Sequence, residues 1–247
     1  QPLIVERPFR AIHHTASSAS IIGGGTNARP WEISLAHKGV LFLDEILEFQ
    51  KTVLEVLRQP LEDGEITVTR VNASYNYPAK FSLVGAMNPC PCGYLTDPDK
   101  ACICSPNQIA NYRGRLSWPL LDRVDMYIEV PKVPTEDFRK SREIHSEDSH
   151  TIQTRVQKAR NIQLERFHAL WISSNAEMKS KDTKHFCKLE SESEQILSRA
   201  VKTMNLSARS YYRILKLART IADLEGVDMI TLSHILEALS YRKKEED

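Results

Sequence analysis

The sequence predicts an α/β unit built on a parallel sheet, followed by an all-helical unit. In the first half, short apolar runs and a helical pattern follow the order strand, helix, hairpin and strand, which is typical of an α/β sheet. From about residue 151 onward the recurring pattern is helical. Pro131 and Pro134 punctuate the stretch between the halves, so we place the domain boundary between residues 1–131 and 132–247.

The sheet is expected to include the apolar run at residues 39–43, which ends at Asp44 and Glu45. A short, continuous apolar run is typical of a strand buried on both faces of a parallel sheet. Apolar residues at helical spacing then predict one helix over residues 49–61, with Gly64 in its stop signal. The two acids are therefore expected at the carboxyl end of a buried strand.

Three more strand patterns complete the first half. Apolar residues that alternate with threonines predict a half-exposed strand over residues 65–70, in a hairpin that extends to Lys80. Residues 80–87 predict a second core strand that ends at Asn88, and residues 127–130 predict a further strand. Together these patterns indicate an α/β sheet with an appended hairpin.

Helical patterns dominate the second half. Residues 151–167 predict a charged, amphipathic helix, and residues 192–204 predict another. The polar stretch 172–183 between them predicts a loop.

The clearest helix is predicted over residues 208–225. Ser207 is a good N-cap for it, and Gly226 is typical of the residue that ends a helix. A last helix is expected to begin after Thr231 or Ser233.

The composition excludes several classes of protein. A formal net charge of +1 gives no overall attraction to nucleic acid or membrane, so any such attraction must come from local patches. No run approaches 18 apolar residues, and residues 1–10 lack the layout of a signal peptide. We therefore expect a cytoplasmic location and no membrane partner.

Asp44 and Glu45 carry the clearest chemistry. Two adjacent carboxylates at the end of a buried strand suit nucleotide hydrolysis, in which one acid holds Mg²⁺ and the other orients or deprotonates water. A buried strand followed by an ordinary acidic turn gives the same pattern, so these residues alone leave both interpretations open.

Four of the five cysteines lie within fifteen residues, in two C-x-C pairs. Four thiolates are a ligand set that tetrahedral Zn²⁺ accepts. Four reduced thiols in an exposed loop are the alternative, because C-x-C is tighter than the usual spacing. The candidate zinc ligands are Cys90, Cys92, Cys102 and Cys104.

Two histidines, His13 and His14, stand side by side. Neighbours on a regular element point apart, so joint metal binding is not expected. We expect hydrogen-bonding roles for this pair.

Eight segments spread along the chain carry further motifs: residues 7–15 (RPFRAIHHT), 23–25 (GGG), 32–37 (EISLAH), 88–93 (NPCPCG), 120–125 (LLDRVD), 155–160 (RVQKAR), 206–215 (LSARSYYRIL) and 218–224 (ARTIADL). Together they resemble the ComM/YifB family of bacterial magnesium-chelatase-like AAA+ ATPases. The resemblance covers nearly the whole chain. It implies a partial AAA+ P-loop NTPase core, a parallel sheet with helices, followed by an all-α lid domain.

The same resemblance implies a role for five residues. Asp44 and Glu45 correspond to the Walker B pair, with Asp44 holding Mg²⁺ through water and Glu45 acting in catalysis. Asn88 resembles sensor 1, Arg123 resembles the arginine finger that completes a neighbouring subunit's site, and Arg209 resembles sensor 2. ATP and Mg²⁺ are the implied cofactors.

Two of these roles have structural alternatives. Asn88 precedes a proline and could simply form a turn. Arg123 could form a structural salt bridge with Asp122 or Asp125.

Arg209 begins a basic stripe that Arg213 and Lys216 continue at helical spacing. No acid occurs in the sequence between Gln195 and Ala222, so the positive field would be uncancelled locally and would suit a phosphate of nucleotide or DNA. A solvated basic face is the alternative.

The phosphate-binding loop is missing from these 247 residues. None of the nine glycines is followed by lysine, so the sequence holds no G-x-x-x-x-G-K-[ST], and the triplet at 23–25 is expected to be a flexible loop. In the family this loop lies upstream, together with a Lon-protease-like domain. We therefore expect a C-terminal fragment with negligible ATP turnover by itself.

The resemblance implies an ATP-driven remodelling motor, a homo-hexamer when full length, that acts on DNA in competence or recombination. The hairpin at residues 65–80 would then line a central pore. Two alternatives stay open: a non-catalytic DNA-binding helix-turn-helix formed by the last two helices, and a zinc-stapled scaffold.

Overall fold

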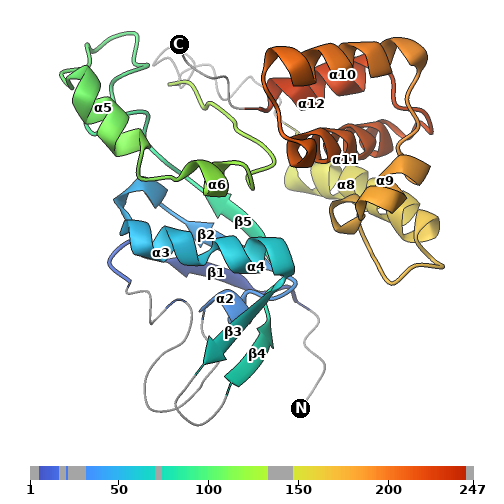
Figure 1. The fold of residues 1–247 in the computed structure, drawn as a ribbon, viewed down its shortest axis with the longest axis horizontal. Helices are drawn as coiled ribbons and strands as arrows, with labels where there is room; N and C mark the ends of the chain where they lie inside the picture. Colours follow the sequence, from blue (N-terminus) through green and yellow to red (C-terminus); the bar gives the residue numbers. More distant parts are fainter. Residues whose placement is uncertain (1–5, 17–20, 22–31, 70–73, 133–146, 243–247) are drawn as a thin grey trace. The chain divides into compact units, whose positions relative to one another are not determined.

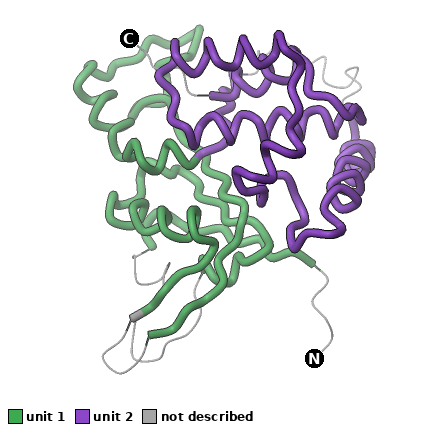
Figure 2. Tube along the Cα trace, turned by 45° about the vertical axis from the view of Figure 1, so that its right-hand side comes forward, with its two compact units in different colours: residues 1–123 green, residues 124–247 purple. Residues whose placement is uncertain are grey.

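The computed structural model describes residues 6–16, 21, 32–69, 74–132 and 147–242, and the chain forms two compact units, residues 1–123 and 124–247 (Figures 1 and 2). The glycine triplet, the tip of the hairpin and the charged C-terminal tail lie outside the described residues. Among the described residues, no helix combines the length and the apolar character needed to cross a bilayer.

A parallel sheet of three strands forms the centre of the first unit (Figure 1). The strands are β1 (Phe9–Ile12), β2 (Val40–Leu43) and β5 (Ser82–Gly85), in the order β1-β2-β5. Ile12 pairs with Leu43, and Leu43 pairs with Gly85, so all three strands end at the same level. The predicted α/β sheet is confirmed, although β5 is shorter than the predicted strand at 80–87.

Two helices replace the single one predicted after β2. A short 3-10 turn, η1 (Ile46–Glu48), is followed by α3 (Lys51–Val56) and α4 (Arg58–Asp63). Pro60 explains the break, because it has no N–H to donate to the carbonyl of Val56 and its ring would clash with that carbonyl. The Leu57 N–H bonds back to the Leu54 carbonyl oxygen at 3.1 Å, which tightens the chain at the junction.

The predicted hairpin is present as β3 (Glu65–Thr69) and β4 (Ser74–Pro78), which pair antiparallel. Ile66 and Val68 are buried, as the alternating pattern predicted. Gly64 ends α4 with φ 71°, a left-handed conformation that glycine adopts at little cost.

The predicted strand at residues 127–130 is wrong, because these residues have no regular secondary structure and belong to no sheet in the described part of the chain. The Tyr127 N–H instead donates to the Tyr241 carbonyl oxygen at 2.8 Å. Before them the sequence patterns missed α2 (Glu32–Leu35), α5 (Pro106–Arg113) and α6 (Trp118–Leu121). None of these three helices is long enough to show apolar residues recurring at helical spacing, so the sequence contained little signal for them.

The second unit is helical, as predicted. Phe167, Leu197, Ile214 and Ile235 lie in one buried core. Its helices are α8 (Ser149–Arg166), α9 (Ser180–Phe186), α10 (Ser191–Thr203), α11 (Ala208–Glu225) and α12 (Leu232–Ser240), with a 3-10 turn η2 (Asn175–Glu177).

The prediction of a loop over residues 172–183 is wrong in part, since η2 and the first turn of α9 fall within it. By contrast, α11 has the predicted bounds: the Ser207 hydroxyl accepts the Ser210 N–H, and Gly226 ends the helix at φ 78°.

Candidate functional site

The polar residues singled out in the first half follow neighbouring strands of the sheet. Asp44 and Glu45 come directly after β2, and Asn88 lies three residues after the end of β5. Because parallel strands end at one edge, this arrangement brings the three side chains to the carboxyl edge of the sheet, where α/β proteins bind ligands. We call His14, Asp44, Glu45 and Asn88 the carboxyl-edge cluster.

Backbone hydrogen bonds tie together the two loops that bear these residues. The Ala86 N–H donates to the Leu43 carbonyl oxygen at 3.0 Å, and the Ile46 N–H donates to the Ala86 carbonyl oxygen at 2.9 Å. These two bonds extend the pairing of β2 and β5 past the ends of the strands. They fix the backbone on both sides of Glu45 against the segment that leads to Asn88.

Glu45 has an unusual backbone for a residue with a side chain. Its φ of 50° and ψ of 48° lie in the left-handed region, at a cost of about 1 to 2 kcal/mol. The Asp44 Oδ1 atom accepts the Glu45 N–H at 3.0 Å, which supports this turn. Both carboxylate residues are exposed, so the turn presents two acids to solvent rather than burying them.

The sequence patterns did not predict that His14 lies beside Glu45. Its Nδ1 atom lies 3.3 Å from Oε2 of Glu45, and His13 Nδ1 lies 2.9 Å from the Thr15 hydroxyl. The expected hydrogen-bonding role is therefore confirmed for His13, while His14 contacts the carboxylate of Glu45. The expectation that the two rings point apart is wrong: their centroids are 4.2 Å apart, because the residues lie at the turn after β1 and not on a regular element.

Arg123 lies just beyond α6, and its side chain is only 9% exposed. It forms an ion pair with Glu62, and its Nη1 atom donates to the Pro119 carbonyl oxygen at 2.6 Å. A structural salt bridge with Asp122 or Asp125 was the alternative to the arginine-finger role of Arg123. The structure shows an ion pair of Arg123 with Glu62, which is 61 residues away in sequence.

The four cysteines of the first unit lie together, with all four sulfurs within 4.8 Å of one another. Cys90 Sγ lies 3.4 Å from Cys92 Sγ, and Cys102 Sγ lies 3.6 Å from each of them. Four sulfurs around tetrahedral zinc stand about 3.8 Å apart, given Zn–S bonds of about 2.3 Å. The cluster, completed by Cys104, therefore fits a metal of this kind.

The thiols of this cluster have unequal pKa values. The backbone N–H groups of Tyr94 and Ile103 lower the pKa of Cys92 to about 6, while burial raises the pKa of Cys104 to about 12. A sulfur that two backbone donors stabilise as thiolate is a suitable first ligand for a metal, and neighbouring thiols lose their protons as the metal binds.

In the second unit the basic stripe of α11 is only partly exposed. Arg209 is exposed, but Arg213 donates to Asp125 at 2.7 Å and Lys216 donates to the Ala176 carbonyl oxygen at 3.0 Å. Burial lowers the pKa of Lys216. The expectation that this charge is uncancelled is therefore wrong at Arg213, because Asp125 reaches it from far away in sequence.

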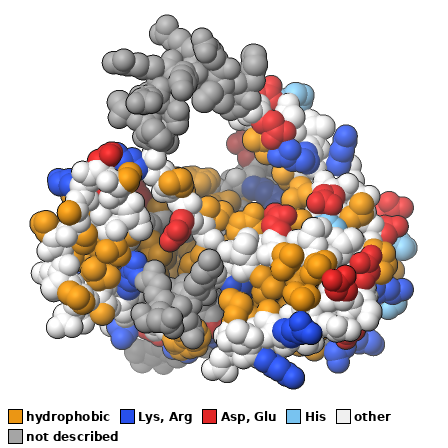
Figure 3. Space-filling view, turned by 90° about the horizontal axis from the view of Figure 1, so that it is seen from above, with side chains coloured by type: hydrophobic (Ala, Val, Ile, Leu, Met, Phe, Trp, Pro, Cys, Tyr) orange, Lys and Arg blue, Asp and Glu red, His pale blue; other side chains and the backbone are white. Residues whose placement is uncertain are grey.

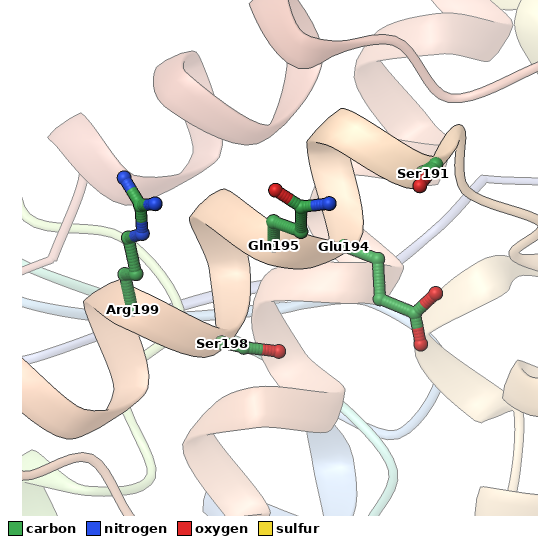
Figure 4. A pocket seen from close by; sticks show the side chains of 5 residues that line it. All are labelled: Ser191, Glu194, Gln195, Ser198 and Arg199. Atoms are coloured by element: carbon green, nitrogen blue, oxygen red, sulfur yellow. The ribbon is translucent and has the colours of Figure 1, made fainter.

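The surface pocket drawn in Figure 4 lies along α10. Its lining residues all come from this helix and all are exposed: Ser191, Glu194, Gln195, Ser198 and Arg199. Without a second element to enclose a ligand, this hollow offers little specificity. On the face shown in Figure 3, acidic and basic side chains are interspersed rather than gathered into a field of one sign.

Comparisons with known proteins agree with this architecture. The family model described as magnesium chelatase, subunit ChlI, matches residues 1–138, and the model of the ChlI C-terminal region matches residues 146–242. The fold and the matched regions thus define a magnesium-chelatase-like AAA+ protein with a helical second domain.

Individual relatives narrow the assignment. The chain is 47% identical to competence protein ComM of Haemophilus influenzae and 45% identical to the uncharacterized protein YifB of Escherichia coli, in each case over 96% of this chain. Subunit ChlI of the magnesium chelatase of Mesostigma viride is 29% identical over 56% of the chain. The chain belongs to the ComM/YifB family, and it spans 45% and 46% of the lengths of the first two relatives.

Proposed function

We propose that Asp44, Glu45 and Asn88 are the hydrolytic half of an ATP site in an ATP-driven remodelling motor that acts on DNA. The observation that carries the proposal is the register of the sheet. Leu43 and Gly85 are paired, so the Walker B candidates and the sensor 1 candidate leave the sheet side by side. The family assignment supports an ATPase, since the sequence motifs resemble magnesium-chelatase-like AAA+ ATPases and the family model described as magnesium chelatase, subunit ChlI, matches residues 1–138.

The oxygen donors at this edge fit a hard cation, which takes carboxylate and water ligands. Mg²⁺ bound with ATP would supply charge neutralisation on the phosphates. Asp44 would hold the cation through water. The exposed carboxylate of Glu45 would orient the attacking water or accept a proton from it. His14 restrains the Glu45 carboxylate at 3.3 Å, so this contact must yield when Glu45 acts as a base.

Three further parts of the proposal concern Arg123, Arg209 and the substrate. In a homo-hexamer, Arg123 would reach the nucleotide of a neighbouring subunit, and for this it must exchange its ion pair with Glu62. We assign the role of sensor 2 to Arg209, which is exposed at the start of α11. DNA as substrate rests on the competence function named for the Haemophilus relative and on the resemblance to that family.

Zn²⁺ is the ion we propose for the four-cysteine cluster. Its ligand set, sulfur spacing and the low pKa of Cys92 support this choice over four free thiols. The ion would cross-link the loop that begins two residues after Asn88.

The test is ATP turnover by a longer protein that joins this chain to a phosphate-binding loop, with and without DNA. We expect turnover that DNA stimulates and that Glu45→Gln lowers at least about a hundredfold while ATP binding persists. A longer protein that binds no ATP would contradict the proposal.

A DNA-binding helix-turn-helix of α11 and α12 is the second candidate. The turn between them is well built, because buried Arg219 donates to the carbonyl oxygens of Val227 and Asp228. Yet α12 carries no lysine or arginine, and its exposed residues include Leu236 and Glu237. Salt-dependent DNA binding by the second unit alone, without nucleotide, would favour this candidate.

A further inference from the structure

We propose that the four-cysteine cluster is a metal-dependent brace for the ATP site, and that Arg113 and Arg115 are the positioning residues through which it acts. The inference rests on the proposed function of Glu45 and Asn88. It adds a form of regulation: metal in the cluster controls how firmly the two catalytic loops are held together.

The first step is the path of the chain around the cluster. Cys90 follows Asn88 by two residues, and Cys104 directly precedes Ser105. Ser105 caps α5, since its hydroxyl accepts the Gln108 N–H and the Gln108 side chain accepts the Ser105 N–H. A metal bound to the cysteines would therefore join the end of the Asn88 loop to the beginning of a capped helix.

The second step is the far end of that helix, where two arginines reach back to the catalytic loops. Arg113 Nε donates to the Pro89 carbonyl oxygen at 3.2 Å, next to Asn88. Arg115 Nη1 donates to the Leu47 carbonyl oxygen at 2.6 Å and to Glu48 Oε2 at 2.9 Å, within three residues of Glu45. Arg113 and Arg115 thus contact both loops from one helix end.

Two buried residues, Tyr112 and Leu47, support the contacts of Arg115 with the Glu45 loop. Tyr112, between the cluster and the two arginines in sequence, is 5% exposed, and burial together with Glu48 raises its pKa. The Arg115 guanidinium also lies 5.6 Å from the centre of the Tyr112 ring. Leu47 is fully buried in the sheet core, so the segment that Arg115 holds is itself anchored.

The third step is that α5 forms a second connection between the two catalytic loops. The two catalytic loops are already joined by the hydrogen bonds of Ile46 to Ala86 and of Ala86 to Leu43. With Arg113 on one loop and Arg115 on the other, α5 adds a second connection whose starting point is fixed by the cysteines. If metal fixes that starting point, opening of the loops becomes rarer, and the Ile46 and Ala86 amides report it.

Amide hydrogen exchange tests the brace directly in the 247-residue chain, with Zn²⁺ itself as the probe. We expect one Zn²⁺ per chain, and exchange at Ile46 and Ala86 about tenfold faster after chelation, the effect of losing about one charged hydrogen bond. In Arg113→Ala/Arg115→Ala, Zn²⁺ should still bind while both amides exchange at the fast rate. Lys100→Ala is the matched control: Lys100 lies over the Tyr94 ring in the same loop, and its removal should leave the exchange rates unchanged.

Three results would overturn the brace: no Zn²⁺ binding, exchange rates that do not respond to Zn²⁺, or a double variant that keeps the Zn²⁺-dependent protection. In the longer protein the double variant should lower kcat about tenfold and leave the Kd for ATP unchanged. Zn²⁺-dependent protection in a chain whose longer form binds no ATP would leave the brace standing and refute the ATP site. ATP turnover by the longer protein, with amide exchange that does not respond to Zn²⁺, would support the ATP site and refute the brace.

Discussion

Charged side chains are exposed at the carboxyl edge of the first unit, but they are buried and paired in the core of the second unit. At the edge, Asp44 and Glu45 are exposed, and one of them sits on a strained backbone. In the second unit, Asp223 is 2% exposed and Arg219 is 1% exposed, and they are bonded to each other at 3.1 Å. Arg166 forms a second ion pair with the same aspartate.

We interpret this difference as one of role: the exposed carboxylates bind a ligand, and the buried ion pairs stabilise the fold. The Asp223 carboxylate also accepts the Asn175 amide at 2.7 Å, so its oxygens are saturated by protein groups. The carboxylates of the edge have few protein partners and can accept a hydrated cation. Changes in the buried network should therefore alter stability, whereas changes at the edge should alter turnover.

Asp223→Asn should produce the largest effect. It leaves the buried guanidinium of Arg219 and the partly buried one of Arg166 without their counter-charge, at an expected cost of about 3 to 5 kcal/mol in the free energy of unfolding. Denaturant unfolding of the chain followed by circular dichroism measures this cost. Glu237→Gln is the exposed control on α12 and should change stability by less than about 0.5 kcal/mol. Equal effects of the two variants would remove the distinction between the regions.

Asn88→Ala should come next, with an effect on turnover and not on folding. Loss of one group that contacts the reacting phosphate lowers turnover by about 10² to 10³, which is about 2.7 to 4 kcal/mol. Steady-state ATP hydrolysis by the longer protein provides the measurement, and the unfolding midpoint of the 247-residue chain should not move. An unchanged rate would make Asn88 a turn former only.

Gly226→Ala tests the backbone of the turn that the buried network supports. At φ 78° the new methyl group meets no atom within 4 Å, so the cost is conformational alone, about 1 kcal/mol. Thermal unfolding should show a correspondingly lower midpoint. A midpoint equal to that of the wild-type chain would mean that the turn relaxes freely.

The smallest effect should come from His37, whose Nδ1 atom accepts the Lys80 N–H at 3.1 Å. Burial, together with Lys38 and Lys80, lowers its pKa, so the unfolded chain binds the proton more readily. Stability from this group is full above the unfolded pKa of about 6.5 and is lost as the pH falls through the lower folded value. His37→Gln should flatten this part of the pH profile of unfolding; an unchanged profile would refute the assignment.

The sequence was most informative where one local signal decides the structure. The caps at Ser207 and Gly226 predicted α11 to the residue, and the apolar run before Asp44 predicted β2. It was less informative elsewhere: the single helix predicted at 49–61 neglected the local effect of Pro60, and residues 127–130 form no strand in the described part of the chain, where strand formation would have required long-range pairing.

The candidate site divides in the same way. The residue types and motifs predicted that Asp44, Glu45 and Asn88 are functional, and the register of the sheet brings them to one edge. The contacts of His14 with Glu45 and of Arg123 with Glu62 depend on how loops fold over the sheet, for which the chain has no short-range signal. The same holds for Arg113 and Arg115.

The central claim is that the carboxyl edge hydrolyses a nucleotide. Its most direct test separates binding from hydrolysis in the longer protein, by measuring the Kd for Mg-ATP and the single-turnover rate for wild type, Glu45→Gln and the exposed control Asp63→Asn. We expect Glu45→Gln alone to lose at least about a hundredfold in rate with its Kd unchanged. A Glu45→Gln protein that hydrolyses ATP at the wild-type rate would contradict the account.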